Sequence, residues 1–227
     1  MAKAVLLLED GFQLEGDNFG ASGEAFGEVV FNTSISGYQE VLTDPSYRGQ
    51  IVTMTYPLIG NYWINPEDGE SSRAWLAGFI VREVSELRSN WRSTADLSAW
   101  LAEQGIVGIQ GIDTRALTRH LRMEGARHGV ISSVDRDRAS LARKLAAAPR
   151  IVGVDLVQEV SCPAPYEWTE GLPGAAAVPA AGLSLITLPL ATVPLKPCVT
   201  VPTVSPAPVM ADVAAASEFP TTFGTAA

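Results

Sequence analysis

The sequence contains few of the residues that most catalytic sites use. Among 227 residues there are two cysteines and two histidines. Cys162 and Cys198 stand in neither a CxxC pair nor a Cys/His ligand spacing, so neither a disulfide framework nor a zinc site is predicted. No GxxxxGK[ST] loop is present to cradle the phosphates of ATP. We therefore expect no metal site and no cofactor in this chain.

Positive charge is also scarce, with 16 Lys and Arg against 25 Asp and Glu and a net charge of -9. Nucleic acid is an unexpected partner for such a chain, because phosphate contacts need a local excess of cations. The apolar run at residues 4–8 is too short for a signal peptide, so a cytoplasmic location is expected. Four prolines interrupt the uncharged stretch 171–195, and we predict no membrane span there.

Two regions differ in composition. Nine of the 15 prolines lie between residues 173 and 220, where only Lys196, Asp212 and Glu218 are charged. Such Ala- and Pro-rich sequence supports neither a helical stripe nor an uninterrupted strand. We predict a folded domain over residues 1–150, a linker over 151–173 and a low-complexity tail over 174–227. The tail is expected to be largely irregular and disordered.

The first half of the folded region favours strands. Short runs rich in apolar or β-branched residues alternate with turn residues, and Asp10-Gly11 is a hairpin-type turn. The predicted strands are 4–8, 12–15, 28–33, 50–55, 78–81, 106–109 and 129–131.

Helices are predicted in the second half. Thr94, Asp113 and Asp137 stand where N-caps are expected, and Gly105 and Gly125 stand where the first two helices stop. Strands followed by alternating helices and strands indicate an α+β fold, with the helices packed on a sheet as a sandwich.

Several separate motifs carry a resemblance to a known family. They are GEVVFNTSISGYQEVLTDPSYRGQIVTMTYPLIGN at 27–61, ESSR at 70–73, GFIVRE at 78–83 and GIQGIDTRALTRHLR at 108–122. Together they closely resemble the N-terminal domain of the carbamoyl phosphate synthetase small subunit, from about residue 3 to residue 173.

The resemblance implies a swivelling β/β/α domain that packs against a large subunit, which uses ATP and Mg. It also implies a second domain, a class I glutamine amidotransferase, whose cysteine nucleophile releases ammonia from glutamine. The large subunit would use this ammonia to make carbamoyl phosphate for arginine and pyrimidine synthesis.

Ser46 is the one functional residue that the resemblance places in this sequence. It lies in Thr43-Asp44-Pro45-Ser46-Tyr47, and the family implies that it contacts glutamine at the domain junction. The residues themselves also predict a turn, because Asp44 can accept backbone hydrogen bonds and Pro45 presets φ.

Residues for amide hydrolysis are not recognisable in this sequence. Glutamine hydrolysis of this class needs a thiolate beside an imidazole, in a Gly-x-Cys-x-Gly elbow and a later His-Pro-Glu, and neither pattern occurs. Cys162 and Cys198 are interpreted as idle or buried, and His120 and His128 as surface or satisfied histidines. We therefore predict no catalytic residue and an inactive isolated chain.

The sequence departs from the family pattern at two places. The proline-rich tail begins where a first catalytic-domain strand is expected, and a reading-frame shift near Gly174 is our hypothesis. The other two frames of the gene would then encode the missing elbow. Trp63 occupies a position where the family usually has glycine, so strain is expected if φ is positive there.

Three functions remain open at this point. The first is the small chain of a glutamine-hydrolysing carbamoyl phosphate synthase. The second is a noncatalytic domain that docks on the large subunit without hydrolysing glutamine, and the third is a free-standing ligand-binding module. The arginines at 115, 119, 122 and 127 fit either a solvated helix face or part of the contact with the large subunit.

Overall fold

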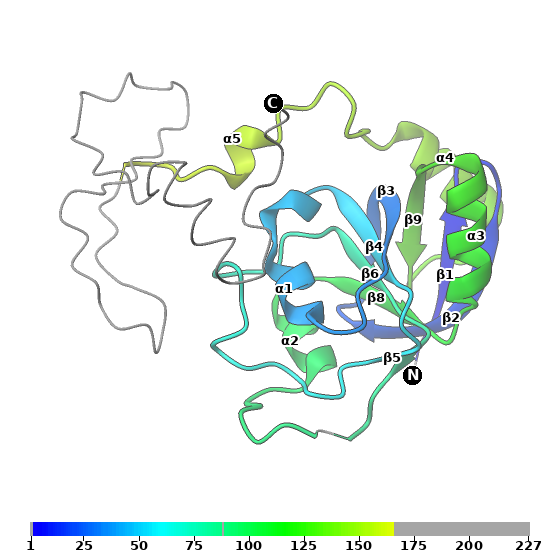
Figure 1. The fold of residues 1–227 in the computed structure, drawn as a ribbon. Helices are drawn as coiled ribbons and strands as arrows, with labels where there is room; N and C mark the ends of the chain where they lie inside the picture. The colour runs from blue at the N-terminus through cyan, green and yellow to red at the C-terminus, as the bar shows by residue number, and fades with distance from the viewer. Residues whose placement is uncertain (1, 88, 166–227) are drawn as a thin grey trace, which may run out of the picture. The chain divides into compact units, whose positions relative to one another are not determined.

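The computed structural model describes residues 2–87 and 89–165 (Figure 1). A first compact unit is Met1–Val160, and a second is Ser161–Ala227. The predicted tail, Cys198 and the uncharged stretch 171–195 lie outside the described residues. No helix within the described ranges is long and apolar enough to cross a membrane.

The elements of the first unit alternate irregularly between strands and helices. The strands are β1 (Lys3–Leu8), β2 (Gln13–Gly20), β3 (Glu24–Asn32), β4 (Gln50–Met54), β5 (Leu58–Ile59), β6 (Gly78–Ile80), β7 (Glu83–Val84), β8 (Val107–Gln110) and β9 (Arg127–Ser132). The helices are α1 (Tyr38–Thr43), the 3₁₀ turn η1 (Pro45–Tyr47), α2 (Leu97–Glu103), α3 (Thr114–Glu124), α4 (Arg138–Ala147) and α5 (Val157–Val160).

Seven strands form a closed barrel in the order β1-β2-β8-β6-β4-β3-β9, and β9 pairs with β1 to complete it. The neighbours β3, β4, β6 and β8 are parallel, whereas β1, β2 and β9 join antiparallel. The predicted α+β class is therefore confirmed in its mixture of helices and strands. The predicted sandwich is instead a barrel, because β1 has partners on both of its edges.

The apolar run of β1 is explained by burial on both strand faces. Leu6 and Leu8 join a core cluster that collects side chains from six of the barrel strands and therefore marks the barrel interior. Val5 and Leu7, which point the other way, pack with α4 in a second cluster. A strand buried on both sides is continuously apolar, as this one is.

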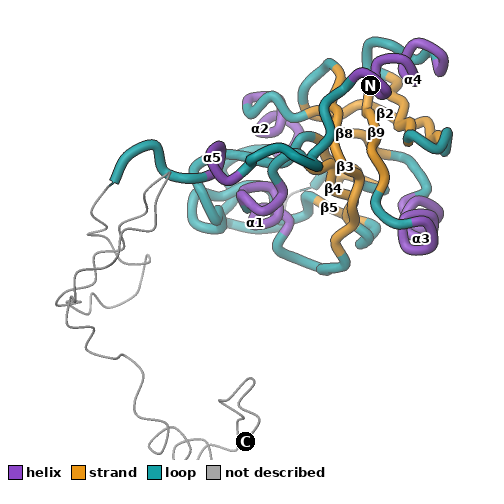
Figure 2. The backbone as a smooth tube through the Cα atoms, turned by 90° about the horizontal axis from the view of Figure 1, so that it is seen from above, coloured by secondary structure: helices purple, strands orange, loops and turns teal. Residues whose placement is uncertain are grey.

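Two helices cover different parts of the barrel. α3 contributes Leu117 and Leu121 to the interior cluster, and α2 packs Leu97 and Leu101 into an outer cluster with α1. Figures 1 and 2 both place α3 on the side of the barrel away from α1 and α5.

Helix capping agrees with the sequence at four of five predicted sites. Asp113 and Asp137 accept hydrogen bonds from backbone N–H groups in the first turns of α3 and α4. Gly105 and Gly125 follow the ends of α2 and α3, each with a positive φ. The predicted cap Thr94 is wrong: Asp96 caps α2, its carboxylate accepting from the N–H of Ala99, because the helix begins later, at Leu97.

Candidate functional site

The turn that carries Ser46 directly follows α1. Asp44 Oδ1 accepts a hydrogen bond from the backbone N–H of Ser46 at 2.8 Å, and Pro45 begins η1. The predicted turn chemistry is thus confirmed. Ser46 is exposed, and within the described residues its hydroxyl forms no hydrogen bond. The turn therefore presents a hydroxyl that can donate and accept.

Side chains of the following residues anchor this turn. Tyr47 Oη accepts a hydrogen bond from Asn32 Nδ2 at 2.9 Å. Arg48 Nε donates to Glu159 Oε2 at 2.6 Å. The first contact ties the turn to the end of β3, and the second ties it to α5, more than a hundred residues later in the sequence.

The segment 151–160 packs beside the same turn. Gly49 has a φ of 80°, and a Cβ at this position would lie 3.1 Å from Ile151 and 3.7 Å from Leu156. Glycine is favoured here by the positive φ and by the close approach of Ile151. The start of the predicted linker therefore packs against Gly49, which directly precedes β4 and closely follows Ser46 in the sequence.

Helix α1, which leads into the turn, begins without a side-chain cap of its own. Gly37 is its N-cap residue, and the hydroxyl of Tyr62 accepts from the backbone N–H groups of Gly37 and Tyr38 at 2.6 and 3.0 Å. The rings of Tyr38 and Tyr62 stack with centroids 4.2 Å apart. Burial raises the pKa of both phenols above the usual value, so both stay protonated at neutral pH.

The long loop that follows β5 forms hydrogen bonds with residues near both ends of α1. The side chain of Gln39 donates to the backbone carbonyl of Asn65 and accepts from its N–H, at 2.5 and 3.0 Å. Thr43 Oγ1 accepts from the N–H of Glu70 at 2.9 Å, and Ser71 Oγ donates to the carbonyl of Thr43 at 2.6 Å. The ESSR motif thus helps to fix the helix end from which the Ser46 turn departs.

Trp63 has the positive φ for which the sequence predicts strain. Its φ is 53°, in the left-handed region that bulky residues avoid. Its N–H donates to the carbonyl of Gly60 at 3.0 Å, and its carbonyl accepts from Tyr38 Oη at 2.8 Å. Two backbone hydrogen bonds therefore hold Trp63 in this conformation.

The two histidines have separate structural settings. His120 Nε2 lies 2.6 Å from Asp10 Oδ2, and its ring stacks on Phe12 with centroids 4.4 Å apart. The interpretation of His120 as a satisfied histidine is therefore confirmed. His128 is neither exposed nor satisfied: it is 6% exposed, and neither ring nitrogen has a hydrogen-bond partner in the described part of the chain. Burial lowers its pKa below the usual value.

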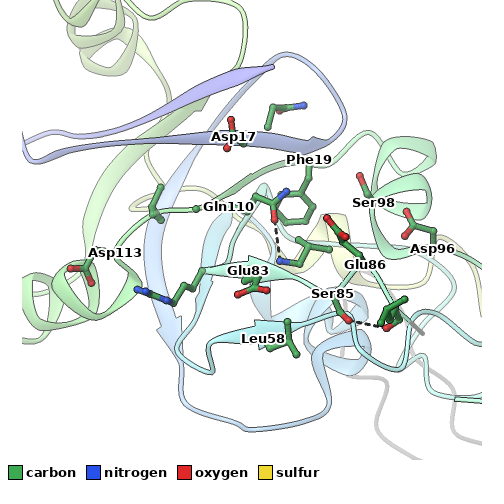
Figure 3. Close-up of a pocket in the computed structure, with 16 residues that line it drawn as sticks. Asp17, Phe19, Leu58, Glu83, Ser85, Glu86, Asp96, Ser98, Gln110 and Asp113 are labelled. Carbon is green, nitrogen blue, oxygen red and sulfur yellow. Dashed lines mark hydrogen bonds between the residues drawn. The ribbon is translucent and has the colours of Figure 1, made fainter. Parts of the chain in front are cut away.

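A wide hollow of about 1020 Å³ lies beside β2, β7 and the starts of α2 and α3, and Figure 3 shows the carboxylates around it. Several of them already have structural roles. Asp96 and Asp113 cap helices, and Asp17 pairs with Lys3 at 2.7 Å. Gln110 Oε1 accepts from the N–H of Val84 at 3.0 Å. Three of the five carboxylates in this lining therefore have roles in folding.

A second hollow, of about 530 Å³, lies along α3 and is basic. Arg82, Arg115, Arg119 and Arg122 line it. Arg127, which was predicted to belong with the last three, points to different partners, Asp10 and Glu124, each at 3.6 Å. The arginine stretch is thus split between an ion-pair network and an open face.

Metal and thiol chemistry find no support in the described residues. No group of three His, Cys, Asp or Glu side chains there could hold a metal ion. Cys162 is a partly exposed free thiol of the second unit, and no hydrogen bond that the structure describes joins it to a histidine.

The first unit is a small mixed barrel that carries an exposed serine turn and a basic face along α3. Residues 6–131 match the family described as carbamoyl-phosphate synthase small chain, CPSase domain. The matched range begins within β1 and ends within β9, and it contains the other five barrel strands completely. This chain belongs to that family.

Relatives named carbamoyl phosphate synthase small chain agree with this assignment. The protein from Syntrophotalea carbinolica is 64% identical over 169 residues, covering 74% of this chain and 45% of its own length. That from Rhodopirellula baltica is 58% identical, covering 74% and 43%. That from Nitratidesulfovibrio vulgaris Hildenborough is 50% identical over 184 residues, covering 81% and 49%. The chain spans somewhat less than half the length of the relatives it matches.

Proposed function

We propose that this chain acts in glutamine-dependent carbamoyl phosphate synthesis, as the part of the small chain that docks on a large, ATP- and Mg-using subunit. In that role it belongs to the machinery that moves ammonia from glutamine to the large subunit, for arginine and pyrimidine synthesis in the cytoplasm. The observation that carries the proposal is the family match, which includes residues from every strand of the barrel.

The division of labour within the chain is the second part of the proposal. The sequence has neither a Gly-x-Cys-x-Gly elbow nor a His-Pro-Glu. Among the described residues, no hydrogen-bond partner orients the buried ring of His128 as a base. A thiol without an activating imidazole is a weak nucleophile near neutral pH. We therefore infer that the chain docks without hydrolysing glutamine on its own.

Mixing experiments separate docking from hydrolysis. The purified chain is combined with the carbamoyl phosphate synthase large chain, and complex formation is followed by size-exclusion chromatography with light scattering. We expect a complex with no release of ammonia from glutamine above background, while added ammonium salt supports carbamoyl phosphate synthesis. Failure to form a complex argues against the docking role, and glutaminase activity of the purified chain argues against the noncatalytic one.

Ser46 is proposed to contact glutamine where the barrel meets an amidotransferase domain. The support is an exposed hydroxyl on a turn that Asp44, Tyr47 and Arg48 hold in place. A hydroxyl contact of this kind contributes about 1 kcal/mol to binding, and each 1.4 kcal/mol corresponds to a factor of ten in affinity.

A hybrid chain makes this contact measurable. Residues 1–173 are joined to the remaining part of the Syntrophotalea relative, and the hybrid is assembled with the large chain. Ser46→Ala is expected to raise the KM for glutamine roughly five- to tenfold, with ammonia-dependent synthesis unchanged. Ser34→Ala, at another exposed serine, is the matched control. Equal KM values for the two variants would remove Ser46 from the site.

A further inference from the structure

The open face of α3 gathers cations that the fold does not use. Arg82, Arg115, Arg119 and Arg122 are all exposed and line the 530 Å³ hollow. Lys3, Arg48, Arg92, Arg127, Lys144 and Arg150 form ion pairs with carboxylates of the described residues, and none of the four arginines of the hollow does. Arg73, Arg136, Arg138 and Arg143 form none there either, but they do not line this hollow. The chain has a net charge of -9. Four neighbouring cations without a carboxylate partner in the described residues therefore point to a negatively charged partner outside the chain.

The arrangement of the arginines is a row on a rigid support. Arg115, Arg119 and Arg122 stand at i, i+4 and i+7 of α3, which places them on one face over about 10 Å. Leu117 and Leu121, on the opposite face, are buried in the barrel interior. The guanidinium groups therefore extend from a helix whose position the core fixes.

The rest of the lining supplies polar and apolar contacts beside the row. Thr33, Thr55 and Thr118 line the hollow together with Pro57. Tyr56, which stands between two of these residues in the sequence, is 41% exposed. Arginine and tyrosine are the residue types enriched at the centres of protein interfaces.

We propose that this arginine face, defined as Arg82, Arg115, Arg119 and Arg122 with the hollow between them, binds a carboxylate-bearing surface of the large chain. This inference rests on the proposed docking function and assigns a surface and a chemistry to it. An extended protein surface fits better than a small ligand, because all four cations are exposed and three of them are spread along α3. Guanidinium groups bind carboxylates in a bidentate fashion.

Charge reversal on α3 tests the proposal against the large chain. Arg119→Glu and the double variant Arg115→Ser/Arg119→Ser are compared with wild type by calorimetry at 50 and 200 mM NaCl. We expect the affinity to fall at least tenfold for Arg119→Glu, with a smaller loss for the double variant, and the salt dependence of the affinity to become weaker in both. Thermal unfolding confirms that the variants fold.

Arg143→Glu is the matched control, since Arg143 is an exposed arginine of α4 outside the hollow. It changes the net charge as Arg119→Glu does and should leave the affinity within twofold. Wild-type affinity in Arg119→Glu overturns the proposed surface while leaving docking intact, and equal losses in both glutamate variants overturn it as a general charge effect. Absence of wild-type binding overturns the docking function and this inference together.

A polyanion arm separates protein from nucleic-acid partners. A short duplex DNA replaces the large chain in the same titrations. The proposal expects no measurable binding at 200 mM NaCl. Tight DNA binding that Arg119→Glu abolishes, with unchanged affinity for the large chain, would assign the face to phosphate and overturn the proposal.

Discussion

Arg48 and Glu159, which are 111 residues apart, join through a hydrogen bond and ion pair at 2.6 Å. The contact links the residues after the Ser46 turn to α5, near the end of the first compact unit. Both side chains are 42% exposed, so solvent screens the pair and its contribution to stability is small. Its effect is to fix where the chain runs after leaving α4.

Glu159→Gln tests this positioning role. We expect faster amide hydrogen exchange over residues 151–160, because the segment loses its charged anchor, and a change of less than about 1 kcal/mol in the free energy of unfolding. Glu103→Gln, an exposed glutamate of α2, is the control for the lost charge. Unchanged exchange at 151–160 would show that the apolar contacts of Ile151 and Leu156 suffice.

The hydroxyl of Tyr62 is expected to stabilise the start of α1. Tyr62→Phe removes the acceptor for two backbone N–H groups, at Gly37 and Tyr38, and should lower the free energy of unfolding by about 1 to 2 kcal/mol. Tyr56→Phe is the control, since Tyr56 is 41% exposed. Urea titrations measure both variants, and an equal loss in the two would contradict the capping role.

Backbone strain at Trp63 is measurable by comparing two substitutions. Both Trp63→Gly and Trp63→Ala remove the indole, but only glycine adopts a φ of 53° without a steric cost. The glycine variant should be more stable than the alanine variant by about 1 to 2 kcal/mol. Equal stability would mean that the loop relaxes to a negative φ once the ring is gone.

His128 predicts a loss of stability in mild acid. Burial lowers its folded-state pKa below the usual 6.5, and the nearby Arg150 adds to the effect. Protonation therefore favours the unfolded chain, and stability falls as the pH drops from about 6.5 toward the lower folded-state pKa. His128→Leu should flatten the dependence of unfolding free energy on pH between 7.5 and 5.5. An unchanged slope in His128→Leu would assign the effect to other groups.

Carboxylates govern stability at lower pH. The pKa of Asp10 is lowered: burial opposes the change, but the N–H of Phe12 and the side chains of His120 and Arg127 outweigh it. A carboxylate with a depressed pKa contributes stability above its unfolded-state value, and this is lost as the pH falls below about 4. Asp10→Asn should therefore make acid unfolding less steep, and it leaves the window of His128 unaffected.

Sequence reasoning found the barrel strands because each is a short run with its own turn residues. Asp10-Gly11 predicted the first hairpin, and β1 and β2 pair there as expected. The helix α1 was missed for two reasons. Its six residues are too few to show a repeated helical period, and its cap, Tyr62, comes from another segment of the chain. Sequence reasoning also placed the cap of α2 at Thr94 instead of Asp96, because both residue types cap helices well.

Some features of the candidate site could be predicted from the sequence, and others could not. The turn chemistry of Asp44, Pro45 and Ser46 is local, so five consecutive residues predicted it. Such reasoning could not find the pairing of Glu159 with Arg48. It also could not place Arg82 beside the arginines of α3, because no neighbouring residue in the sequence indicates either contact.

What the sequence by itself determined are the local elements, namely most strand and helix segments and the Ser46 turn, together with the family. The tertiary structure alone decided that the sheet closes through β1 and β9 and that four arginines share one open face. It also decided that the ring of His128 is buried with no hydrogen-bond partner among the described residues. The physical reason is that periodicity and turn preferences act over a few residues. Strand partners and neighbouring charges depend on packing between segments that the chain brings together only when it folds.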